Sequence, residues 1–195
     1  MVRNVKDNEW LPSAAAQRVS GIKRYALEGL QERGIIRHDN GAKIHADDLN
    51  MLITWMKNTY VTGETNIKKD QPIGFAVPLT DDELSPLLEL SEENGADEAL
   101  QSLHQSGMTV GPNQILTGWW HCRDEMVTYL ENAKAPLLGV TGGFVTSGAW
   151  IDALAATQVI GRGRAFLATR MTDAELAKFR GYVPRINQTG TYIGI

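Results

Sequence analysis

The sequence contains only one cysteine, Cys122, among its 195 residues. A single thiol excludes an internal disulfide and any metal cluster held by cysteines alone. The sequence also lacks an apolar run near the roughly 20 residues that a membrane helix needs, and its first ten residues contain no apolar signal segment. These absences predict a chain that is cytoplasmic on synthesis and has no membrane partner.

Familiar catalytic and nucleotide-binding motifs are missing too. The glycine-rich stretch 139–148 has no lysine where a P-loop needs one and lacks the glycine spacing of a dinucleotide-binding loop. Val145 stands where a serine nucleophile elbow has its first glycine. The sequence therefore predicts no catalytic residue, no metal and no cofactor, and it favours a protein that is not an enzyme.

Basic residues are missing from one long stretch, since no Lys or Arg lies between Lys69 and Arg123. Acidic residues crowd positions 81–98, whereas basic residues prevail from Arg162 onward, and the net charge is -4. A net acidic chain without an aromatic platform motif argues against nucleic acid as a partner. The uneven charge favours association of the chain with itself or with partner subunits.

Hydrophobic spacing and capping signals predict mostly helices. We expect an α+β, helix-rich fold, with about six or seven helices and a small sheet contributed mainly by the C-terminal third. A mainly helical part (1–134) and a mixed part with a C-terminal arm (135–195) would form one compact domain. The expected helices cover 13–34, 47–60, two segments within 85–107, 117–133, 147–159 and 172–181, and the expected strands cover 73–77, 164–170 and the tail.

The stretch "TGWWHCRDEM", residues 117–126, gathers several reactive side chains. On a helix, Cys122 and His121 would point about 100° apart, so they cannot form a catalytic pair. Cys122 would join an apolar stripe as a small buried side chain. Trp120 would lie at the edge of that stripe, where an aromatic can contact a partner.

The leading functional hypothesis is a structural or assembly protein that forms homo- or hetero-oligomeric contacts. The apolar tail 190–195 can add a strand to a neighbouring molecule, as the arms of virion and other large-assembly subunits do, or can pair within the protein's own sheet. Such a chain would be incorporated into a larger particle. The interface candidates are Trp120, Tyr192, Ile193 and Ile195.

The alternative is a small-ligand-binding protein or enzyme that uses the glycine-rich loop 139–148. Backbone N–H groups at a strand-to-helix turn can bind an anion, and glycine allows the close approach. Ser147 would cap the following helix. The ligand-binding candidates are Thr141, Gly142, Gly143, Thr146, Ser147, Arg162 and Arg164.

Overall fold

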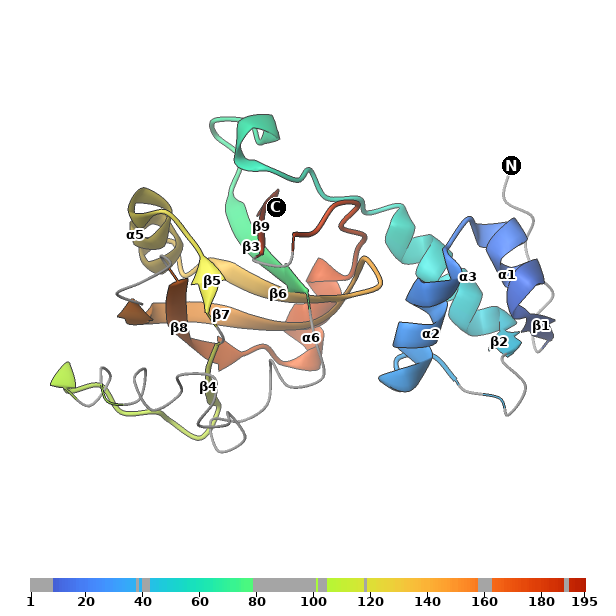
Figure 1. The fold of residues 1–195 in the computed structure, drawn as a ribbon, viewed down its shortest axis with the longest axis horizontal. Helices are drawn as coiled ribbons and strands as arrows, with labels where there is room; N and C mark the ends of the chain where they lie inside the picture. Colours follow the sequence, from blue (N-terminus) through green and yellow to red (C-terminus); the bar gives the residue numbers. More distant parts are fainter. Residues whose placement is uncertain are drawn as a thin grey trace.

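The computed structural model describes residues 9–37, 39, 43–78, 101, 105–117, 119–157, 163–187 and 190–195. These residues form a helical unit near the N-terminus and a larger unit built on a sheet, which lie side by side (Figure 1). The two helices expected within 85–107 fall largely outside the described residues.

The helical unit spans residues 9–56. Its core collects apolar side chains from all three of its helices, including Ala16, Leu27 and Leu49, which are fully buried. Two short strands pair antiparallel at its edge, with Leu11 opposite Ile44. Its elements are β1 (Trp10–Pro12), α1 (Ser13–Ser20), α2 (Arg24–Glu32), β2 (Lys43–His45) and α3 (Ala46–Met56).

The single helix expected over residues 13–34 is wrong, because the chain breaks at Gly21. Gly21 has a φ of 75°, a left-handed conformation that glycine adopts without strain, and it ends α1. Three residues later α2 begins. The apolar spacing runs on through the break because Ile22, in the turn, is buried in the same core as the helices.

The second unit is built on a mixed seven-stranded sheet, in the order β4-β8-β7-β6-β3-β9, with β5 also paired to β8. β3 pairs parallel with β6, and the other paired neighbours run antiparallel. The strands are β3 (Ile73–Pro78), β4 (Gln114–Leu116), β5 (Trp120–His121), β6 (Pro136–Thr141), β7 (Phe144–Thr157), β8 (Gly163–Arg170) and β9 (Thr191–Gly194).

The expected fold class is therefore wrong. Among the residues that the structure describes there are five α-helices, and the sheet is large rather than small. It draws strands from residue 73 to residue 194, so β3, β4 and β5 share it with the strands of the C-terminal third. The remaining helices are α5 (Asp124–Asn132) and α6 (Asp173–Leu176), with the short 3-10 helices η1 (Glu64–Asn66) and η4 (Ala177–Phe179).

The largest error concerns residues 147–159, where a helix was expected and β7 is found. The pairing of β7 with β8 shifts register between Ile151 and Ala153 and again between Leu154 and Ala156. Each bulge inserts a residue and reverses which face the next side chains occupy. The two-residue alternation that identifies a strand is therefore broken twice, and the sequence imitates helical spacing.

Other expectations hold. The strand expected over 73–77 is β3, and the strand expected over 164–170 is β8. Thr172 and Glu175 form the predicted capping box at the start of α6. Both faces of the sheet are covered, since Leu137 on β6 packs in the cluster with α5 and its neighbour Leu138 packs in the cluster with α6.

Candidate functional site

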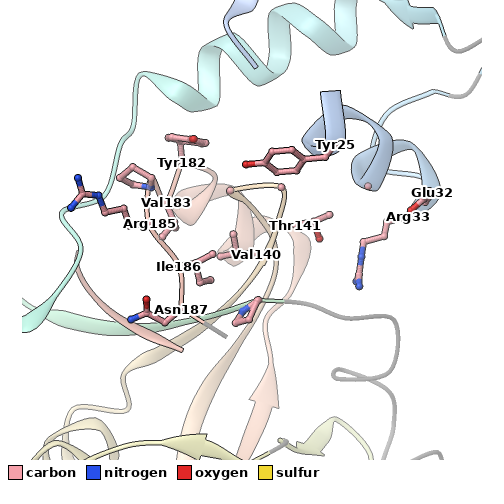
Figure 2. A pocket seen from close by; sticks show the side chains of 15 residues that line it. Tyr25, Glu32, Arg33, Val140, Thr141, Tyr182, Val183, Arg185, Ile186 and Asn187 are labelled. Carbon is pink, nitrogen blue, oxygen red and sulfur yellow. The ribbon is translucent and has the colours of Figure 1, made fainter. Parts of the chain in front are cut away.

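A cleft of about 760 Å³ lies between α2 of the helical unit and the turn that joins β6 to β7 (Figure 2). Its size suits a small organic ligand. Segments far apart in the chain form its walls: α2, the end of β6 with its turn, and the segment 182–187 that precedes β9. The lining residues are Tyr25, Gly29, Glu32, Arg33, Pro78, Val140, Thr141, Gly142, Gly143, Tyr182, Val183, Pro184, Arg185, Ile186 and Asn187.

The β6–β7 turn sets one wall of the cleft directly against α2. Gly142 and Gly143 have φ values of 59° and 92°, as a two-residue hairpin turn with both central residues left-handed requires. A Cβ atom built on Gly142 would lie 2.7 Å from the Cα atom of Ala26. Gly143 is held from behind, because its carbonyl oxygen accepts a hydrogen bond of 2.7 Å from the Val183 N–H.

An apolar joint beside the cleft fixes the two units to each other. Phe144, the first residue of β7, is fully buried and packs in the core of the helical unit. The rings of Trp55 on α3 and Phe144 lie 6.4 Å apart, and the Arg180 guanidinium stacks 4.8 Å from the Trp55 ring centroid. Burial lowers the pKa of Arg180 from its ordinary value.

Aromatic and charged groups share the cleft. The Tyr25 side chain is 66% exposed and extends from α2 across the cleft toward Tyr182 (Figure 2). Arg33 and Glu32 stand on the α2 side, and Arg185 stands on the opposite side. A molecule in this cleft would meet a ring face, hydrogen-bonding groups and more positive than negative side chains.

A second surface of interest is the start of α2 on the helical unit. Lys23, Arg24 and Tyr25 are all exposed, and the Lys23 Nζ atom lies 5.8 Å from the Tyr25 ring centroid. The Arg24 Nε–H donates a 2.7 Å hydrogen bond to Glu28, but both side chains are well exposed. Surface pairs of this kind contribute about 1 kcal/mol or less, so Arg24 can exchange partners.

The strand β2 and the segment before it add two more exposed cations, Arg37 and Lys43. Arg37 donates hydrogen bonds from its backbone N–H and its guanidinium to Asp48 on α3, both 2.8 Å long. Burial works to raise the pKa of Asp48, but these hydrogen bonds outweigh it and hold that pKa below its ordinary value. The pair ties the segment after α2 to the start of α3.

The ligand-binding residues expected from the sequence separate into groups. Thr141, Gly142 and Gly143 line the cleft. Thr146 lies behind it, buried, with its hydroxyl 3.1 Å from that of Thr141. Ser147 lies within β7 and caps no helix, because the expected helix is a strand.

Of the two candidate arginines, Arg164 does not line the cleft. Arg164 is buried on β8, where its guanidinium donates a hydrogen bond to Asp124 at the start of α5. Arg162 lies outside the described residues.

The expected interface residues lie mainly inside the protein. Trp120 is only 3% exposed, because residues 120–121 form β5 and the helix expected over 117–133 begins at Asp124. Ile193 is fully buried, Tyr192 is half-buried, and Ile195 is 36% exposed.

The tail occupies the protein's own sheet, one of the two arrangements that the sequence left open. β9 pairs antiparallel with β3, placing Tyr192 opposite Phe75. Its outer edge is covered as well, since the Gly63 N–H donates to the Tyr192 carbonyl and the Gly194 N–H donates to the Val61 carbonyl. A neighbouring chain would have to displace these bonds before it could pair with β9.

Cys122 is a buried thiol, and its Sγ atom lies 3.1 Å from the Tyr192 hydroxyl. Burial raises the pKa of Cys122, and burial likewise raises the pKa of Tyr192. Both groups are therefore neutral at physiological pH. A protonated, buried thiol is a poor nucleophile.

In the part of the chain that the structure describes, no helix combines the length and the apolar character needed to cross a membrane. Nor do three or more His, Cys, Asp or Glu side chains of this part gather as a metal ion would require.

The sequence did not single out the exposed residues at the start of α2. Lys23, Arg24 and Tyr25 were counted as the middle of one long helix, where exposed polar residues are ordinary. The available signal was Gly21, which is followed by one apolar residue and then two basic residues.

No protein-family model matches the chain, and no curated protein or solved structure matches it.

Proposed function

We propose that the helical unit binds duplex DNA as a helix-turn-helix, with α2 as the recognition helix. The observation that carries the proposal is the three-residue turn, Gly21 to Lys23, between the eight-residue α1 and the nine-residue α2. Two helices joined by a short turn with a glycine, the second bearing exposed polar residues at its start, match the arrangement that places a helix in the major groove.

The exposed residues divide into two roles. Recognition helices read base edges with residues near their N-terminus, which in α2 are Arg24 and Tyr25. An arginine can bond both acceptors of a guanine edge. Lys23, Arg37 and Lys43 would contact phosphates and set the register of the protein on the duplex.

The overall negative charge, which in the sequence argued against a nucleic-acid partner, does not describe the helical unit. Residues 9–56 hold six Lys and Arg against six Asp and Glu, while the densest acidic run lies at 81–98. The β6–β7 turn touches α2 at Ala26 and leaves its first residues exposed. The N-terminal end of α2 is therefore exposed. The helical unit that carries it is nearly neutral and has exposed cations around this end.

The test is selection of bound duplexes from a random pool by the full chain at about 50 mM salt, where phosphate contacts contribute strongly. We expect an enriched sequence motif, and an Arg24→Ala variant that binds it about tenfold or more weakly and loses preference at one or two positions. Lys178→Ala, on the exposed surface of η4, is the matched control and should bind normally. A pool without enrichment, or equal binding by Arg24→Ala and the parent protein, would contradict the proposal.

Self-association stands as a second proposal, as the sequence predicted from its uneven charge. Helix-turn-helix proteins commonly bind paired half-sites as dimers, so assembly and DNA binding are compatible. A cytoplasmic chain incorporated into a larger particle would be one setting for both. Light scattering on the purified chain, with and without the selected duplex, tests this proposal, and a single monomeric mass in both samples would contradict it.

A further inference from the structure

We infer that the cleft between α2 and the β6–β7 turn is a binding site for a small organic anion that carries a flat ring. This site differs from the surface of α2 that we propose to contact DNA bases, although Tyr25 belongs to both. The inference rests on the shape and lining of the cleft and does not require that the protein bind DNA.

The ring preference comes from Tyr25. Tyr25 lines the cleft and is 66% exposed, so its ring offers surface to a ligand beside the Lys23 Nζ atom, which lies 5.8 Å from the ring centroid. Aromatic groups stack on such a ring in offset geometry, and each pair contributes about 0.5–1.5 kcal/mol beyond the area buried. Ile186, which is partly exposed, supplies apolar surface on the facing wall, and the nearly buried Val140 and Val183 lie beneath it.

The preference for an anion comes from the charged lining. Among the described residues that line the cleft, Arg33 follows directly after α2 and Arg185 lies in the segment before β9, while Glu32 contributes a carboxylate. Figure 2 shows Asn187 on the Arg185 side of the cleft, where its amide can donate a hydrogen bond, and Thr141 nearer to Arg33, with its hydroxyl 3.1 Å from that of Thr146. A carboxylate, sulfonate or phosphate attached to a ring would use both features.

The cleft is also preformed. Gly142 rests on the backbone of Ala26, and Gly143 is bonded to Val183. Phe144 anchors the start of β7 in the helical core. A ligand therefore need not order these walls, and less of its binding energy is lost to ordering.

Anilinonaphthalene sulfonate, a fluorescent ring-bearing anion, is a suitable probe for the folded full-length chain. We expect one saturable site, with the uncharged analogue phenylnaphthylamine and inorganic sulfate each binding about tenfold more weakly or worse. Tyr25→Ala and Arg33→Gln should each weaken binding of the probe. Lys68→Gln, on an exposed loop away from the cleft lining, is the control and should change nothing.

Equal binding of the charged and uncharged probes would show a merely apolar surface and would overturn the anion assignment. No saturable binding, or binding that survives both cleft substitutions, would overturn the site itself. Where DNA binding is established as well, the shared Tyr25 leads us to expect that the probe and the duplex compete. Only this competition experiment depends on the proposed DNA binding, because binding of the probe to the cleft is measured without DNA.

Discussion

Gly142 of the β6–β7 turn lies against the backbone of Ala26 in α2, so closely that a methyl group on Gly142 would come within 2.7 Å of the Ala26 Cα atom. This contact joins the sheet to the helix that we assign to recognition. It also makes glycine necessary at position 142 for two reasons, the left-handed backbone and the lack of space.

Gly142→Ala should therefore reduce the free energy of unfolding by more than backbone strain alone. Gly34→Ala is the matched control, since Gly34 has a similar positive φ but nothing within 4 Å of a built Cβ. We expect the control to lose about 1–2 kcal/mol from strain, and Gly142→Ala to lose at least about 1 kcal/mol more from overpacking. Urea denaturation measures both, and equal losses would show that the contact with α2 is loose.

DNA binding should weaken with salt in proportion to the phosphates contacted. With Lys23, Arg37 and Lys43 as the contacts, the slope of log affinity against log salt should be about -3. Lys43→Gln should reduce its magnitude by about one without changing the preferred sequence. Fluorescence anisotropy on the selected duplex measures the slope, and an unchanged slope would remove Lys43 from the phosphate contacts.

The Arg37–Asp48 pair should make stability depend on pH on the acidic side. The pKa of Asp48 lies below its ordinary value in the folded protein, so its ionised form stabilises the fold above about pH 4. That contribution is lost as the pH falls through the lowered pKa. The gap in unfolding free energy between the parent protein and Asp48→Asn should narrow below about pH 4, and a gap that stays constant would contradict this assignment.

Cys122 should react slowly with a soluble aromatic disulfide while the protein is folded. Burial both blocks access to the thiol and raises its pKa, so little thiolate is present near pH 7. In concentrated urea the same thiol should react at the rate of a small peptide thiol. Fast reaction of the native protein would show that this part of the core opens readily.

Ile193→Ala should destabilise the protein by about 2–5 kcal/mol, because its fully buried side chain packs in the core on the α6 face of the sheet. Ile195→Ala, at a position that is 36% exposed, should cost less. Thermal unfolding measures the loss of stability in both variants, and light scattering measures their oligomeric mass. A stable Ile193→Ala protein whose oligomeric mass has fallen would instead support the tail as a contact between molecules.

The sequence predicted those elements whose signals are local. The capping box at Thr172 and the strand that begins at Ile73 needed only adjacent residues to be identified. β7 could not be predicted in this way, since its bulges are set by pairing with β8. Trp120 pairs with Arg164, and that distant partner decides that residue 120 is in a strand.

The candidate site was predicted only in part for the same reason. Thr141, Gly142 and Gly143 were identified because a glycine pair is a visible turn signal. Tyr25 and Arg33 line the same cleft because α2 is a separate helix from α1. The helical spacing of apolar residues continues across Gly21, so the sequence pattern did not reveal that break. The cleft is a product of tertiary contacts between segments that no local pattern connects.

The placement of β9 beside β3 has a consequence for the order of folding. The contacts among α1, α2 and α3 lie within residues 13–56, so these helices can pack while later residues are still being synthesised, and Phe144 joins their core afterwards. β3, by contrast, pairs with β6 near residue 138 and with β9 near residue 193, so this part of the sheet is incomplete until β9 has been synthesised. We expect α2 of the nascent chain to be folded before β3 has paired with both of its neighbours.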